Sequence, residues 1–451
     1  MREGRRAAGD EPTASHLRYR HRPFRSRTPP VALTPFPVHL RLRRDAAAVV
    51  RAAIRGSHPG LLLDSAFATT PLPPGPMNVV AAGKAAEPML DALHRSAGDR
   101  IRATAIAIGG HPVPDDASVA AGQRALGVAR RAAAKGDWLV VLLSGGASAM
   151  MEVPVPGITL EDLAATTRLL LASGLPIASM NAVRKHLSAI KGGWLGAVAG
   201  QTLTYALSDV HFPIEDDPSV IGSGPTVADE SRYDDALAAL ARADLTERVP
   251  DAVLAWLRAG AAGQQPETPK PGDARLAHVH FVVAGNRHTV LTAAAHEARS
   301  RGYHVTTIEA PIVGEARAAA AAFAQLAAQA RRPAAFIGGG ETTVTLPGGV
   351  PVRPGGRNQE FALAMAGRLA ALGPAVFVSA GTDGVDGRTD AAGAFSDDTT
   401  VRRAESAGLD IAAALIAHTS HDFFARLDDL LITGPTRTNL GDIQVMLLVD
   451  G

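Results

Sequence analysis

Residues 137–151 read DWLVVLLSGGASAMM. An apolar run ends at Ser144, Gly145 and Gly146, and an alanine-rich segment follows. The apolar run is typical of a buried strand, the glycines of a tight turn, and the last segment of a helix. This order of strand, turn and helix indicates an α/β fold with largely parallel strands.

The same order recurs along the chain. Further strands are predicted in MNVVAA (77–82), QTLTYAL (201–207), HVHFVVAG (278–285), AAFI (334–337, before a glycine triplet) and AVFVSA (375–380). Amphipathic segments follow most of them, and one helix is predicted to begin near Asn181. The fold class predicted is α/β, with two α/β domains, Rossmann-like layered sheets with helices on both faces, and an active-site cleft between the domains.

The Pro-rich polar stretch 261–275 is the best candidate for a linker. The predicted division is a basic disordered tail at 1–33, an N-terminal α/β domain at 34–262, a linker at 263–275 and a C-terminal α/β domain at 276–451. A discontinuous domain, in which an early segment packs against the later half, is an open alternative.

Composition narrows the function classes. The net charge of +1 across 451 residues gives no argument for nucleic acid, and the lack of cysteine excludes disulfides and thiolate metal sites. No apolar run approaches the roughly 20 residues that span a bilayer, and no apolar segment typical of a signal peptide is seen. A soluble cytoplasmic protein without nucleic-acid or membrane partners is expected, and a homodimer is an open alternative.

Polar residues follow nearly every predicted strand. They are Lys84, Ser144, Asp209, Asn286, Arg287, Glu341 and Asp383. Ligands of open α/β sheets bind beyond the carboxyl ends of the strands. Together these residues predict one large polar site.

Two of the cations lie at helix starts, where the helix dipole disfavours positive charge. Lys84 follows a glycine before a predicted helix, and a bound phosphate would reverse the penalty; a solvated surface lysine is the alternative. Arg357 follows Gly355 and Gly356, with Asn358 at or near the N-cap position. It could clamp a carboxylate or phosphate, or pair with Glu360 on the surface.

Two glycine loops are candidates for anion binding. LLSGGASAM (142–150) could cradle phosphate, although an ordinary strand-to-helix turn is equally consistent, and IGSGPT (221–226) is interpreted as a turn. Glu341 directly follows three glycines, a position that binds or caps something.

The acidic stretch at 379–400 suits Mg²⁺ or a proton-accepting carboxylate. Asp383 lies nearest the strand and is the candidate, whereas Asp390, Asp397 and Asp398 are interpreted as turn residues.

The stretch NAVRKHLSAIKGG (181–193) holds Arg184, Lys185, His186 and Lys191, which cannot all share one helix face. We expect one or two of them to reach a site, and we expect His186 to be structural rather than a general base.

These motifs together resemble the glycerate 2-kinase family, also labelled hydroxypyruvate reductase-like or MOFRL-containing. They are AAGKAAEPM, GGHPVPDDAS, LLSGGASAMM, NAVRKHLSAIKGG, LSDV, IGSGPT, GGGETTVTL, GGRNQEFALA, SAGTDGVDGRTDAAGA and TGPTRTNLGDI, in the family's order from about residue 78 onward. The resemblance implies a glycerate kinase domain followed by a MOFRL-type domain. It also implies transfer of phosphate from ATP to the 2-hydroxyl of D-glycerate with a divalent cation.

The residues and the resemblance together give a set of predicted roles. The predicted catalytic residues are Lys84, Arg357, Asp209 and Asp383. The predicted nucleotide-binding residues are Gly83, Ser144, Gly145, Gly146, Ala147, Ser148, Gly340, Glu341 and Asn439. The predicted substrate-binding residues are Arg184, Lys185, Lys191 and Asn358. The predicted ligands of Mg²⁺ are Asp383, Glu341 and Asp209.

The chain departs from the family pattern in the loop after Asp209, among other places, and two alternative functions are open. After LSDV the family usually has a short Gly-Asp turn, whereas this chain reads HFPIEDD (211–217). One alternative function is an NAD(P)H-dependent hydroxypyruvate reductase, although no Gly-x-Gly-x-x-Gly turn supports it. The other is a non-catalytic sugar-acid-binding regulator, which the presence of both Lys84 and Arg357 disfavours.

Overall fold

The computed structural model describes residues 37–346 and 353–450. The tail predicted at 1–33 lies outside these residues. Within them the strands form two sheets. In the first sheet all strands are parallel, in the order β2-β1-β3-β4-β5. Its strands are β1 (Met77–Ala82), β2 (Ile101–Ala107), β3 (Trp138–Leu143), β4 (Thr202–Leu207) and β5 (Val279–Gly285).

The second sheet is mixed, in the order β11-β10-β9-β12-β8-β6, with β7 also paired to β8. Its strands are β6 (His304–Thr307), β7 (Ile312–Glu315), β8 (Ala334–Thr343), β9 (Ala375–Gly381), β10 (Gly393–Asp397), β11 (Leu430–Leu431) and β12 (Asp442–Leu448). β12 runs antiparallel to both β8 and β9, so it begins where those two strands end. This brings the start of one strand and the ends of two others to the same edge.

Helices cover both faces of the first sheet. α2 (Pro59–Thr69) and α3 (Ala86–Ala97) pack on one face, and α4 (Asp116–Lys135) and α8 (Trp194–Ala199) lie on the other. Along β1 the side chains alternate between the two faces. Val79 therefore belongs to one buried cluster and Val80 to another. This layering is the predicted one.

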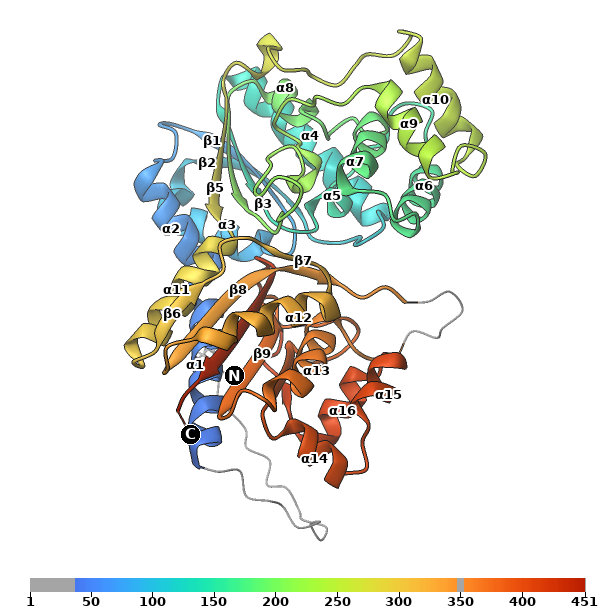
Figure 1. Ribbon diagram of the computed structural model, residues 1–451. Coiled ribbons are helices and arrows are strands. Elements are labelled where there is room, and N and C mark those ends of the chain that lie inside the picture. The colour runs from blue at the N-terminus through green and yellow to red at the C-terminus, as the bar shows by residue number, and fades with distance from the viewer. Residues whose placement is uncertain (1–36, 347–352, 451) are drawn as a thin grey trace, which may run out of the picture. The chain divides into compact units, whose positions relative to one another are not determined.

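The second sheet is covered in the same way (Figure 1). α1 (Pro37–Gly56) and α11 (Arg287–Ser300) pack on one face, and α12 (Ala316–Gln325) and α13 (Arg357–Leu369) on the other. The remaining α-helices are α5 (Ala147–Met150), α6 (Leu160–Ala172), α7 (Ile177–His186), α9 (Tyr233–Arg242), α10 (Asp251–Ala261), α14 (Thr400–Ser406), α15 (Ile411–Ile416) and α16 (Ser420–Leu427). Short 3₁₀ turns are η1 (Gly98–Arg100), η2 (Ile221–Ser223), η3 (Ala274–Leu276) and η4 (Leu326–Gln329). None of the helices in the described ranges is long and apolar enough to cross a membrane.

Two sequence-based predictions of element bounds are corrected. The helix expected to begin near Asn181 begins at Ile177 and ends at His186. The glycine triplet lies inside β8 rather than after it, because β7 packs closely there. A Cβ on Gly340 would come within 2.3 Å of the carbonyl oxygen of Ile312.

Two segments pack with parts of the fold that are distant in the sequence. β5 follows the predicted linker yet pairs with β4 of the first sheet. α1 comes first in the described chain yet packs against β9, β12 and α11. The exact domain ranges stay a prediction, but this pairing has the character of the discontinuous arrangement left open above.

Candidate active site

The site lies where the carboxyl ends of β1, β3, β4, β8 and β9 come together with the start of β12. A cavity of about 1060 Å³ opens there. Its lining residues come from both sheets and include Gly145, Asp209, Arg184, Glu341 and Arg357. Lys84 and Asp383 are not among its lining residues, but their charges influence the pKa of Asp209, which does line it.

Lys84 is held in the turn between β1 and α3. Its backbone N–H donates to the carbonyl oxygen of Gly145 over 2.9 Å, and the next N–H, of Ala85, donates to Ser144 Oγ over 3.0 Å. The side-chain Nζ lies 3.3 Å from Asp383 Oδ2. Lys84 thus joins the end of a strand in one sheet to the end of a strand in the other.

Arg357 is the first residue of α13, and Gly356 is the N-cap. The Asp386 carboxylate accepts the backbone N–H groups of Asn358 and Gln359 over 3.1 and 2.9 Å, which fixes the start of the helix. A Cβ on Gly356 would lie 2.3 Å from the Asp386 carboxylate, so glycine is needed for this approach. Asp386 therefore fixes the start of the helix that carries Arg357.

The guanidinium of Arg357 contacts two carboxylates. Nε and Nη2 donate to Asp442 over 2.6 and 3.0 Å, and Nη1 lies 2.8 Å from Glu341 Oε1. Burial alone would lower the pKa of Arg357, but Asp442 and Glu341 overcome that effect and raise it. Arg357 therefore remains a fixed cation, and it does not pair with Glu360, which binds Arg317 instead.

Asp442 is a site residue that the sequence reasoning missed. It is the first residue of β12, where it pairs with Gly340 and Gly381 at the ends of the neighbouring strands. Polar residues after apolar strands mark the carboxyl ends of the strands, whereas an antiparallel strand brings its amino end to the same edge. The signal was present in the motif TGPTRTNLGDI, which ends one residue beyond Asp442.

Asp209 lies against the glycine loop that follows β3. Asn439 Nδ2 donates to Asp209 Oδ2 over 2.8 Å. A Cβ on Gly145 would lie 2.1 Å from the same oxygen, so only glycine allows this contact. Burial raises the pKa of Asp209; Asp383 adds to the rise, and Lys84 and Arg357 oppose it. Three charged side chains from distant parts of the chain therefore act on Asp209.

Glu341 is a second carboxyl group of the site whose pKa is raised. About half of its side chain, 46%, is open to the cavity. The surrounding protein raises its pKa to about 7, chiefly by excluding water, and the carboxylates of Asp442 and Asp209 contribute while Arg357 opposes. A carboxyl that binds and releases a proton near neutral pH is typical of functional sites.

Arg184 projects into the cavity from the last turn of α7. Its side chain makes no hydrogen bond or ion pair with any residue in the described ranges. Burial lowers its pKa, and Glu152 opposes the change. Whereas Lys84 and Arg357 are each paired with carboxylates, Arg184 is a cavity cation with its hydrogen-bond donors unused.

The other three predicted substrate residues are engaged elsewhere and do not line this cavity. Lys185 pairs with buried Asp229 over 3.0 Å, and Lys191 pairs with buried Glu152. Asn358 is buried and hydrogen-bonded to Asp386 and Ser379. His186 likewise uses both ring nitrogens, on Ala182 and Glu267.

The glycine loop shows which of its groups face the cavity. Gly145, Gly146 and Ser148 line it, and Ser148 Oγ lies 2.6 Å from Ser223 Oγ. Ser144 and Ala147 are buried instead. Gly83 packs against Ser144, where a Cβ would lie 2.4 Å from its Oγ. Gly340 precedes Glu341 in β8 and serves the close packing of β7 described above.

No set of three or more His, Asp or Glu side chains in the described part of the chain is arranged to hold a metal ion. Mg²⁺, however, is usually held by one or two carboxylates together with substrate phosphates and water. Asp383 contributes to the raised pKa of Asp209, so these two carboxylates are the candidate pair. The donor set fits a metal ion that arrives with a nucleotide.

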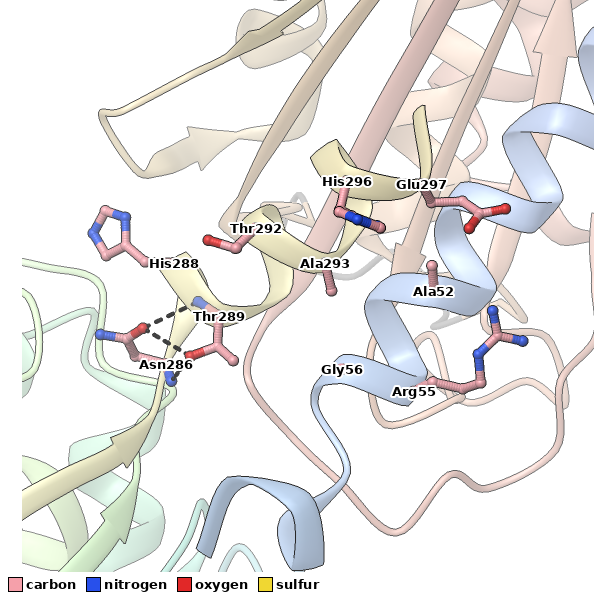
Figure 2. A pocket seen from close by; sticks show the side chains of 10 residues that line it. All are labelled: Ala52, Arg55, Gly56, Asn286, His288, Thr289, Thr292, Ala293, His296 and Glu297. Carbon is pink, nitrogen blue, oxygen red and sulfur yellow. Dashed lines mark hydrogen bonds between the residues drawn. The ribbon is translucent and has the colours of Figure 1, made fainter. Parts of the chain in front are cut away.

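A second cavity, of about 730 Å³, lies between α1 and α11 (Figure 2). Asn286 caps α11 there by exchanging hydrogen bonds with Thr289. His288 also lines it and lies 3.2 Å from Glu215. None of the charged residues of the candidate active site line this cavity. We therefore interpret it as a gap between two packed helices rather than as a second active site.

The fold and the site define an α/β protein with a charged cavity beyond the carboxyl ends of its strands. Residues 45–258 match the model of a domain described only as DUF4147, of unknown function, and residues 334–442 match the MOFRL family. A "Glycerate 2-kinase" of Pyrococcus horikoshii is 36% identical, over 83% of this chain and 88% of that protein.

Two further comparisons agree in extent. A protein of Agrobacterium vitis, provisionally named hydroxypyruvate reductase, is 39% identical over 75% of this chain and 76% of its own. The crystal structure of glycerate kinase from Thermotoga maritima superposes with a TM-score of 0.79 at 33% identity, covering 91% of this chain and all of that one. The chain belongs to the glycerate kinase family built from the DUF4147 and MOFRL regions.

Proposed function

We propose that this chain is a D-glycerate 2-kinase, which transfers the γ-phosphoryl group of ATP to the 2-hydroxyl of D-glycerate. The observation that carries the proposal is a single cavity lined by charged side chains of both signs: Arg184, Arg357, Asp209 and Glu341. The ion pair of Lys84 and Asp383 lies near enough to influence the pKa of Asp209. The names of the relatives support the same activity.

The unpaired cation suggests how the acceptor is held. D-glycerate carries a carboxylate, which a guanidinium binds with two parallel hydrogen bonds. Among the residues that the structure describes, Arg184 has no hydrogen-bond partner, whereas Arg357 donates to Asp442 and contacts Glu341. Arg184 is therefore assigned to the glycerate carboxylate.

Lys84 and Arg357 are assigned to the phosphoryl group. Phosphoryl transfer depends on positioning and on compensation of the charge on the moving oxygens. Both cations are fixed by carboxylate partners, so they need not reorganise when the charge moves. The Gly145–Ser148 segment lies beside them and would supply backbone contacts to phosphate oxygens.

Asp209 is assigned as the acceptor of the proton that leaves the 2-hydroxyl. Its pKa is raised by burial, which makes the carboxylate a better base. Asn439 holds one of its oxygens, Oδ2, over 2.8 Å. The carboxylate would take the proton on its other oxygen, Oδ1.

Mg²⁺ would be held by Asp383 with Asp209 or Glu341, and it would supply positive charge to the nucleotide phosphates.

The test is a coupled assay of ADP release with D-glycerate, ATP and Mg²⁺, run beside NADH consumption with hydroxypyruvate. ADP release that depends on D-glycerate is expected. The second candidate is favoured by the name of the Agrobacterium vitis relative. NADH consumption without ADP release would favour the hydroxypyruvate reductase over the glycerate kinase.

A further inference from the structure

The loop after β4 places an imidazole in the cavity without a hydrogen-bond partner. His211 lines the cavity and is only 6% exposed. Neither Nδ1 nor Nε2 has a hydrogen-bond partner among the described residues. Buried polar atoms are nearly always paired, and an unpaired one costs stability unless a ligand completes it. We propose that His211 binds the 3-hydroxyl of D-glycerate, the hydroxyl that is not phosphorylated; this rests on the proposed kinase function.

The ring is fitted to this place by the backbone beside it. A Cβ on Gly441 would lie 2.3 Å from His211 Nε2, and Gly441 has φ +83°. Glycine is therefore needed both for its backbone conformation and for the approach of the ring. Gly441 directly precedes Asp442, so His211 lies next to the carboxylates that hold Arg357.

The loop that carries His211 is anchored at its far end. Glu215 accepts from Arg287 Nε and Nη2 over 2.8 and 3.1 Å, and Asp216 accepts from Asn286 Nδ2 over 2.5 Å. Arg287 is itself buried. These contacts hold the loop, and with it the ring, against the start of α11. The anchoring residues belong to the HFPIEDD stretch, where this chain departs from the usual family pattern.

The chemistry of the ring suits a hydroxyl. An uncharged imidazole offers one donor and one acceptor, as an alcohol does, whereas a carboxylate only accepts and is matched by Arg184. The reacting 2-hydroxyl must face Asp209, two residues before His211. The apolar part of the lining, including Ile177, Met180 and Val220, is suited to a purine rather than to a polyol.

The test compares D-glycerate with D-lactate, which lacks only the 3-hydroxyl. His211→Phe keeps a ring but removes both nitrogens, His211→Gln restores hydrogen-bonding capacity, and His296→Gln is the matched control at an exposed histidine of α11. kcat/KM for D-glycerate, the inhibition constant of D-lactate and KM for ATP are measured for each variant.

His211→Phe is expected to lower kcat/KM for D-glycerate roughly 10- to 100-fold and to change D-lactate inhibition by less than about threefold. His211→Gln should recover part of the loss, and His296→Gln should match the wild type. The proposal is overturned if His211→Phe weakens the binding of D-glycerate and D-lactate equally, or if it changes neither. It is also overturned if only KM for ATP rises, which would assign the ring to a ribose hydroxyl. A wild type that does not phosphorylate D-glycerate refutes the kinase function instead.

Discussion

At the scale of single residues, Arg184 is expected to contribute to the binding of D-glycerate. Replacing it with Ala should raise KM for D-glycerate and cost about 1.5 to 3 kcal/mol in kcat/KM, because a charged hydrogen-bond donor is lost. Arg184→Lys should recover only part, since the planar fork is missing. Steady-state kinetics test this, with Arg131→Ala on the exposed face of α4 as the control. A variant with unchanged KM would remove Arg184 from the substrate.

Lys84 is expected to act mainly on kcat. Lys84→Ala should lower kcat by the factor that corresponds to a loss of about 3 to 4 kcal/mol in transition-state stabilisation. A loss of this size is seen when a fixed hydrogen-bond donor to a developing charge is removed. The exposed Lys135 at the end of α4 is the matched control, and Lys135→Ala should leave the kinetics unchanged. Near-normal kcat in Lys84→Ala would show that its contact with Asp383 is only structural.

His211 also predicts a pH dependence of stability. Burial lowers its pKa to about 4, and Arg287 contributes. Because an unfolded histidine has a pKa of about 6.5, the unfolded state takes up a proton first as the pH falls. The fold therefore loses up to about 3 kcal/mol from this group between pH 6.5 and pH 4. His211→Gln should lose correspondingly less in urea unfolding across that range. Equal losses of unfolding free energy in the wild type and in His211→Gln would contradict a lowered pKa of His211.

At the scale of elements, the contact between α1 and α11 ties the start of the described chain to its later half. A Cβ on Gly56 would lie 2.4 Å from the Cβ of Ala293, and both residues line the cavity of Figure 2. Gly56→Ala should lower the free energy of unfolding by about 1 to 3 kcal/mol through overpacking. Urea unfolding measures this, and Ala293→Gly in the same protein should restore part of the loss.

Gly127 is the control for this substitution. It lies in the interior of α4, and a Cβ there would meet nothing within 4 Å. Gly127→Ala should therefore raise the free energy of unfolding by about 0.5 to 1 kcal/mol, as expected for a helix interior. If both variants shift stability in the same direction, the α1–α11 contact is not the close one described.

The elements also show what sequence reasoning can reach. The strands before Lys84, Ser144 and Asp209 were predictable, because each is an apolar run that ends in a polar turn. The role of Asp442 was not, because it depends on β12 running antiparallel to its neighbours. The buried partners of Lys185 and Lys191 lie 44 and 39 residues away, and no local pattern points to them.

For the whole molecule, the fold positions chemistry by joining distant parts of the chain. Lys84 and Asp383 are 299 residues apart, and Asn439 and Asp209 are 230 apart. Polar residues at the carboxyl ends of the predicted strands indicated that Lys84, Asp209 and Asp383 would meet, and their exact partners required the structure. Asp397 shows the limit: it was interpreted as a turn residue, and it also pairs with Arg43 of α1, 354 residues away.

The central claim is that this site transfers a phosphoryl group to the 2-hydroxyl of D-glycerate. The most direct measurement is the proton-coupled phosphorus-31 NMR spectrum of the product formed from ATP, Mg²⁺ and D-glycerate. A phosphate on C2 has a single proton on the adjacent carbon, so its signal is a doublet, and a doublet is predicted. A triplet, which marks a phosphate on the CH₂ group of C3, or the absence of any new phosphate ester, would contradict the account.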